Sequence, residues 1–148
     1  MEKKFINPPE IYKHPSYSRV ITVKDGRVVS DVRQETPLDA AAQLAASGVE
    51  CEVVDLRTTS PLDEDTVLES VEGTGRVVVV DEAHPRCSIA TDISALIAQK
   101  AFGALQAPIE MVTAPHTPVP FSTALEDIFI PDAQRIANAV KTVTGWNR

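Results

Sequence analysis

The sequence predicts an α/β fold with three layers, in which helices cover both faces of a mainly parallel sheet, preceded by an N-terminal β-hairpin arm. From Thr36 onwards, short β-branched runs alternate with helical patterns, which is typical of a sheet sandwiched between helices. Residues 76–80 contain four consecutive valines, as expected of a strand that is covered on both faces. A helix-start signal also occurs twice, at Thr36-Pro37-Leu38-Asp39 and at Ser60-Pro61-Leu62-Asp63.

The first 35 residues differ from the rest of the chain in their composition and in their pattern of apolar residues. Pro8, Pro9 and Pro15 favour an extended course, so no helix is expected there. Two β-branched runs, residues 19–24 and 27–32, flank Asp25-Gly26, a pair preferred in two-residue hairpin turns. We therefore expect an N-terminal arm and hairpin over residues 1–35 and an α/β domain over residues 36–148.

Within residues 36–148, helices and strands are expected in alternation. Helices are predicted from apolar residues at helical spacing that stop at glycines, and strands from short runs rich in β-branched residues. The resulting elements are a helix at 37–47, a strand at 51–56, a helix from the Ser60 start signal to Gly73, a central strand at 76–80, a helix at 89–102, a strand at 109–113 and a helix at 132–143.

Composition excludes several classes of function. The chain has 148 residues, enough for one well-packed core. Its 14 Lys and Arg against 21 Asp and Glu give a net charge of -7, which disfavours nucleic acid and anionic membranes as partners. No apolar run approaches the roughly 20 residues of a membrane helix, and the first residues are charged, unlike a signal peptide. A cytoplasmic protein with its two cysteines reduced is expected.

Ligands of open parallel sheets gather beyond the carboxyl ends of the strands, which selects the loops at 57–60, 81–88 and 114–120. The middle loop combines carboxylates, an imidazole, a guanidinium and a thiol, and its candidate polar residues are Asp81, Glu82, His84 and Arg86, next to Cys87. A zinc site would need more ligands, such as His116 brought in by the tertiary fold. A Cys-His nucleophile would need a third, orienting group. A polar loop that caps the following helix is the preferred interpretation.

No catalytic, cofactor-binding or metal-binding residues are therefore assigned, and the scattered glycines form no phosphate-binding loop. Partner contacts are assigned instead. The proline-dense stretch 115–120 is stiff and suits a fixed contact surface, although a rigid connector is the simpler alternative. Gln106 and Glu110, which flank Pro108 near the strand at 109–113, could contact a basic partner, although they also fit ordinary solvated positions. The candidate partner-binding residues are Gln106, Glu110, His116 and Phe121.

Three segments, residues 48–63, 74–83 and 113–122, occur in the same order as matching motifs of a known family. They resemble the C-terminal domain of E1 β subunits of thiamin-diphosphate-dependent 2-oxo acid dehydrogenases. Within that family, residues 84–91 are most similar to acetoin dehydrogenase members. The resemblance implies a transketolase C-terminal-like domain, which packs between subunits and helps bind the acyltransferase E2 core. It also implies that thiamin diphosphate and Mg²⁺ are held by the α subunit and by the pyrimidine-binding part of the β subunit. Neither lies in this chain.

Residues 1–30 depart from that family and resemble the start of RidA-type enamine/imine deaminases, through residues 6–10, Tyr17-Ser18 and the hairpin. A chimera is therefore expected, in which the hairpin replaces the first strand of the sheet. Two functions follow. The preferred one is an isolated E1 β-like domain without activity of its own, which forms homo-oligomers or binds E1 α or E2 subunits. The alternative is an enzyme, either a dehydrogenase component completed by other chains or a deaminase.

Overall fold

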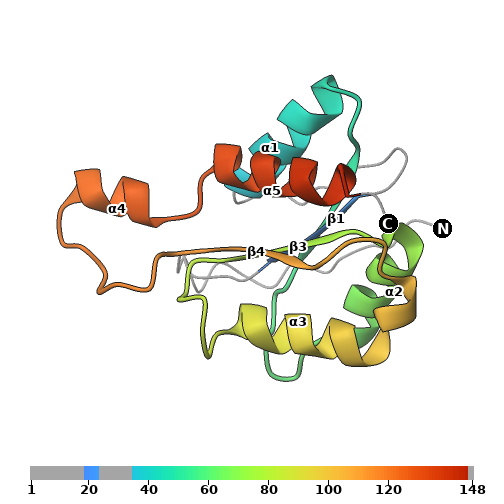
Figure 1. Ribbon diagram of the computed structural model, residues 1–148. Helices are drawn as coiled ribbons and strands as arrows, with labels where there is room; N and C mark the ends of the chain where they lie inside the picture. The colour runs from blue at the N-terminus through green and yellow to red at the C-terminus, as the bar shows by residue number, and fades with distance from the viewer. Residues whose placement is uncertain (1–18, 24–34, 147–148) are drawn as a thin grey trace, which may run out of the picture.

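The computed structural model describes residues 19–23 and 35–146, which form a sheet between two layers of helices (Figure 1). Helices α1 (Glu35–Ala46) and α5 (Ala133–Thr144) cover one face of the sheet, and helices α2 (Glu64–Thr74) and α3 (Ile89–Lys100) cover the other. The three-layer α/β/α prediction is confirmed. No helix in this part of the chain is long and apolar enough to cross a membrane.

The sheet has four strands in the order β2-β1-β3-β4. Strand β3 (Val77–Asp81) pairs in parallel with β4 (Glu110–Thr113), whereas β1 (Arg19–Val23) runs antiparallel both to β3 and to β2 (Cys51–Asp55). Strands β2, β3 and β4 therefore share one direction and β1 alone is reversed. The first strand of the predicted hairpin is thus a strand of the sheet, whereas its turn and second strand, residues 24–32, lie outside the described residues.

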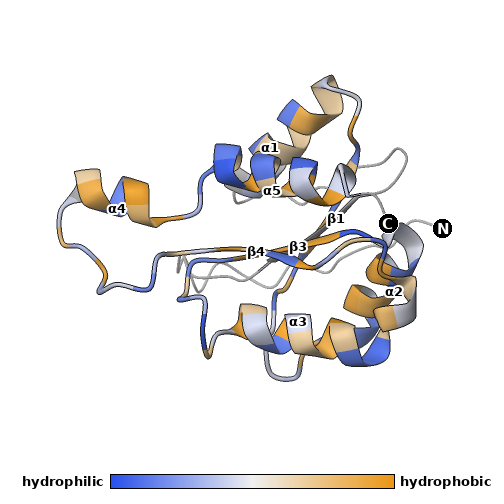
Figure 2. Cartoon of the chain, viewed as in Figure 1, coloured by the Kyte–Doolittle hydropathy of each residue, from blue (hydrophilic) through white to orange (hydrophobic). Residues whose placement is uncertain are grey.

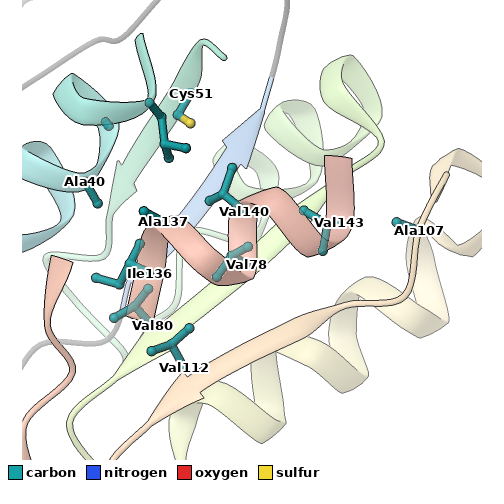
Figure 3. Close-up of a cluster of buried hydrophobic side chains, with 12 residues drawn as sticks. Ala40, Cys51, Val78, Val80, Ala107, Val112, Ile136, Ala137, Val140 and Val143 are labelled. Atoms are coloured by element: carbon teal, nitrogen blue, oxygen red, sulfur yellow. The ribbon is translucent and has the colours of Figure 1, made fainter. Parts of the chain in front are cut away.

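Strand β3 is the centre of the molecule. All five of its residues are buried, and successive side chains of a strand point to opposite faces. Val78 and Val80 belong to the core under α1 and α5, and Val77 and Val79 to the core over α2 and α3. The valine run is therefore the sequence signature of a strand between two apolar cores, and Figure 3 shows the first of them, with Ile136, Val140 and Val143 of α5 directed at β3.

The second helix begins later than its start signal indicated. Asp63, not Ser60, is the N-cap of α2, since its Oδ1 accepts a hydrogen bond from the Thr66 amide at 3.1 Å. Residues 58–62 form a separate turn, in which the Thr58 hydroxyl donates to the Pro61 carbonyl at 3.1 Å. Both Ser60 and Asp63 are good cap residues. Because Ser60 lies within the turn at 58–62, the helix starts after it and Asp63 is the cap. At α5 the expected start is confirmed, because Asp132 accepts from the Arg135 amide at 2.7 Å.

The two cysteines have opposite environments. Cys51 is fully buried on β2, and burial raises the pKa of its thiol to about 11, whereas Cys87 is exposed. The thiolate is the reactive form of cysteine. We expect one equivalent of an aromatic disulfide reagent to react with the folded protein at pH 8, and two after unfolding. The variant Cys87→Ser should leave no fast-reacting thiol. Fast labelling of that variant would contradict the burial of Cys51.

Candidate functional site

Two predicted loops meet at the carboxyl ends of β3 and β4. The amide of Ala114 donates a hydrogen bond to the carbonyl of Ala83 at 3.1 Å, so the loop after β4 is tied to the loop after β3. This is the edge where parallel sheets place their ligands. The third predicted loop follows β2, and its Arg57 Nε lies 3.0 Å from Asp55 Oδ2 on the same strand end.

Asp81 holds the loop after β3 in place. Its side chain is buried, Oδ1 accepts from the Ala83 amide at 3.0 Å, and Oδ2 accepts from the Ala90 amide in the first turn of α3 at 3.2 Å. A carboxylate in this position satisfies helix amides that lack a partner within the helix and is favoured by the helix dipole. Asp81 is therefore a structural cap, in agreement with the preferred interpretation of the loop.

The fold also brings His84 and His116 together. Their ring centroids are 5.4 Å apart, with the rings at 85°, and His84 Nδ1 lies 3.4 Å from the Pro115 carbonyl. That contact is a hydrogen bond when Nδ1 carries the proton. Sequence spacing alone gave no reason to expect this pair. Both imidazoles are exposed, so they form a polar patch on the surface where the loops after β3 and β4 meet.

The described residues offer no metal centre at this edge. Within residues 19–23 and 35–146, no three side chains of His, Cys, Asp or Glu lie close enough to hold an ion. Mg²⁺ that binds phosphate groups is held by one or two carboxylates together with the phosphates and water. The described side chains at this edge of the sheet do not fit such a site, because they form no group of potential ligands. The zinc alternative gains no support, because no third side chain of His, Cys, Asp or Glu joins His84 and His116 among the described residues. The Cys-His alternative gains none either, because the ring contact of His84 is with His116 rather than with a thiol.

Beyond His116, the chain leaves the body of the fold. Residues 115–130, here called the α4 segment, extend past the end of the sheet, carry the short helix α4 (Thr123–Phe129) and return to α5 (Figure 1). Figure 2 shows hydrophobic stretches on this helix. Four large apolar side chains of the segment are exposed, by 61% at Val119, 56% at Leu125, 74% at Ile128 and completely at Phe121.

The four predicted partner-binding residues do not form one surface. His116 and Phe121 belong to the α4 segment. Gln106 lies before β4, at the opposite end of the sheet, where its Oε1 accepts from Arg76 Nη1 at 2.5 Å and its amide donates to the Gly75 carbonyl at 2.7 Å. Glu110 is the first residue of β4. The structure thus separates the two pairs by the length of the strand.

Two features of this end were missed from the sequence. Helix α4 was not expected, because Leu125 and Ile128 face solvent and Phe129 is its one buried large apolar residue, so no buried stripe marks it. Arg135 was not singled out either, although its Nη2 donates to the Thr113 carbonyl at 2.6 Å and so joins α5 to the end of β4. An arginine in the first turn of an amphipathic helix gives no signal that it reaches a distant carbonyl.

In a comparison with known families, residues 33–136 match "Transketolase, C-terminal domain". Among curated proteins, the chain is 65% identical over 128 residues to "Acetoin:2,6-dichlorophenolindophenol oxidoreductase subunit beta" of Cupriavidus necator, covering 83% of this chain and 38% of that protein. It is 54% identical over 110 residues to the protein of the same name in Bacillus subtilis, covering 74% and 32%. The chain therefore spans 38% and 32% of the length of these two relatives.

Pyruvate dehydrogenase relatives are more distant. "Pyruvate dehydrogenase E1 component subunit beta" of Rhizobium meliloti is 40% identical over 123 residues, covering 82% of this chain and 27% of that protein. Among solved structures, "Split gene transketolase, inactive beta4 tetramer" superposes with a TM-score of 0.60 at 23% identity, covering 76% of this chain and 35% of that one. At that identity the superposition supports the fold.

Proposed function

This chain belongs to the transketolase C-terminal domain family, and we propose from that premise that it is a subunit-contact domain of an E1 β-type dehydrogenase component. The observation that carries the proposal is the α4 segment, which presents Val119, Phe121, Leu125 and Ile128 to solvent beside the end of the sheet. A cluster of exposed large apolar side chains marks a protein contact site. The acetoin-type relatives favour an acetoin component over a pyruvate component.

The partners that fit this role are other subunits of the same enzyme. The two most similar curated relatives reported above are named as β subunits, and the superposed transketolase is described as a tetramer. We propose an E1 α-type subunit, the E2 core or a further copy of this chain as the protein that covers the α4 segment. The protein is proposed to be cytoplasmic, as its composition favours.

The cofactor is proposed to lie outside this chain. The buried acidic side chain of the site, Asp81, is already engaged by two backbone amides, and no cluster of potential metal ligands accompanies it in the described part of the chain. Thiamin diphosphate, bound elsewhere in the full enzyme, would supply the nucleophilic carbon chemistry that acts on a substrate carbonyl. In this chain, the residues at the strand ends serve to shape the loops.

The enzyme alternative has less support. A dehydrogenase component completed by other chains remains compatible with the family, but activity would then belong to the assembly. The proposed deaminase and the chimera depend on residues 1–30, most of which lie outside the described residues. The comparisons match the transketolase family, and they lend the RidA-like arm no support.

The proposal is tested by two titrations of the purified chain. We expect calorimetry with thiamin diphosphate and Mg²⁺ to show no saturable heat, and imine hydrolysis to stay at the uncatalysed rate. We expect an E1 α-type subunit of acetoin dehydrogenase to co-elute with the chain in gel filtration. Stoichiometric cofactor binding, or turnover by the chain alone, would contradict the proposed role.

A further inference from the structure

Strands β2 and β3 follow each other along the chain but are not neighbours in the sheet. Both run in the same direction, and each pairs with β1 rather than with the other. Adjacent strands lie about 4.8 Å apart, so β2 and β3 are separated by about 10 Å, the width of one strand. We call this space the acceptor slot. Strand β1 fills it, and in the described sheet β1 is the one neighbour of β2.

The two walls of the acceptor slot need a strand between them. All five residues of β3 are buried, and Val53 and Val78, on opposite sides of the slot, both contribute to the core under α1 and α5. Ile21 of β1 is in register with both of them. A buried backbone amide or carbonyl without a partner is costly. The facing edges of β2 and β3 therefore require an extended segment that pairs with both.

The strand that fills the slot comes from outside the body of the domain. The family match begins at residue 33, and every other helix and strand of the described chain lies between Glu35 and Thr144. Strand β1 ends at Val23 and precedes all of them. It also runs opposite to the other three strands. Residues 35–146 therefore supply the walls of the slot, and a separate segment supplies its occupant.

The pairing in the slot does not depend on how the strand is connected. The ladder uses backbone N–H and C=O groups, which any extended segment without proline offers, and sheets accept added strands from separate chains. A covalent connection raises the local concentration of a strand, to the order of millimolar for a short linker. A free strand of the same sequence therefore competes with β1 once the binding of β1 is weakened.

We propose that the acceptor slot is a binding site for an extended peptide strand, and that a free peptide with the sequence of residues 17–25 binds there in place of β1. The ligand chemistry is that of residues 20–23, a run of β-branched residues that favours an extended strand. The peptide pairs with β2 and β3 in the antiparallel direction of β1. The site is independent of the proposed function, because it lies within the sheet rather than in the α4 segment.

The variant Ile21→Pro of the full chain opens the slot to the peptide. Proline removes a ladder amide and is excluded from central strands, so the melting temperature is expected to fall by about 10 °C. A fluorescent peptide of residues 17–25 is expected to bind this variant at least about ten-fold more tightly than the wild type, whose own β1 competes. Saturating peptide should restore most of the lost melting temperature. Thr22→Gly, which keeps every amide but weakens the strand, should bind with intermediate affinity.

A control peptide and amide exchange locate the binding. The same peptide with proline in place of its Ile21 is expected not to bind. Residues 51–55 pair only with β1 in the described sheet, so they should exchange faster in Ile21→Pro and return to the wild-type rate with the peptide. If Ile21→Pro does not fold, the same readings are taken on Thr22→Gly. Equal binding of the control peptide, no binding to either variant, or exchange at 51–55 that the peptide leaves unchanged would each overturn the proposal.

Discussion

Replacing Asp81 by alanine is expected to lower the free energy of unfolding by about 3 kcal/mol. The change removes the acceptor of two amides, those of Ala83 and Ala90, and leaves the Ala90 amide buried without a partner. A buried donor without an acceptor costs more than the net worth of the hydrogen bond itself. Urea denaturation followed by circular dichroism measures the loss, and the slope of the transition should stay unchanged.

Two variants separate the contribution of this side chain from that of charge alone. Asp81→Asn keeps one acceptor oxygen and should lose about half as much stability as Asp81→Ala. Asp92→Ala removes an exposed carboxylate from the first turn of the same helix and should cost about 0.5 kcal/mol. If Asp81→Ala unfolds at the wild-type urea concentration, Asp81 is not a structural cap, and its burial at the strand end would need a functional explanation.

Replacing Gly75 by alanine is expected to cost about 3 kcal/mol. Gly75 ends α2 in the left-handed region at φ +72, where a side chain is strained. An added Cβ would lie 2.9 Å from the Ala104 carbonyl oxygen and 2.7 Å from Gln106 Nε2. Gln106 can move aside, but the backbone of Ala104 cannot without displacing the turn before β4.

Gly48→Ala is the matched control for this effect. Gly48 has φ +83, but a Cβ there would meet nothing within 4 Å. Its substitution therefore carries the conformational cost alone, about 1 kcal/mol. The difference between the two variants, measured by thermal unfolding, isolates the close approach of the α2 end to the turn before β4. Equal losses at both positions would show that this approach is absent.

The sequence predicts the layers of this fold better than its connections. The valine run of β3 identifies a strand between two cores, because alternate side chains must all be apolar when both faces are covered. The direction of β1 has no such signature, since an alternating or apolar run looks the same read either way. The start of α2 was ambiguous because Ser60 and Asp63 are both good caps, and only the turn at 58–62 distinguishes them.

The candidate site, too, could be predicted only in part from the sequence. The loop with Asp81 and His84 follows a recognisable strand, so its position at the sheet edge was predictable. The approach of His116 to His84 depends on the hydrogen bond between Ala114 and Ala83, a tertiary contact that no local pattern records. Helix α4 was missed for a different reason, because Phe129 is its one buried large apolar residue while Leu125 and Ile128 face solvent.

The account depends on protein contact through the α4 segment, and amide hydrogen exchange tests that claim most directly. Exchange is compared between the chain diluted to monomer and the chain in its associated state, alone or with an E1 α-type subunit. We predict that slowing on association is concentrated in residues 115–130 and in the adjoining loop at 81–88. Slowing confined to the opposite end of the sheet, around Gln106, with residues 115–130 unchanged, would contradict it.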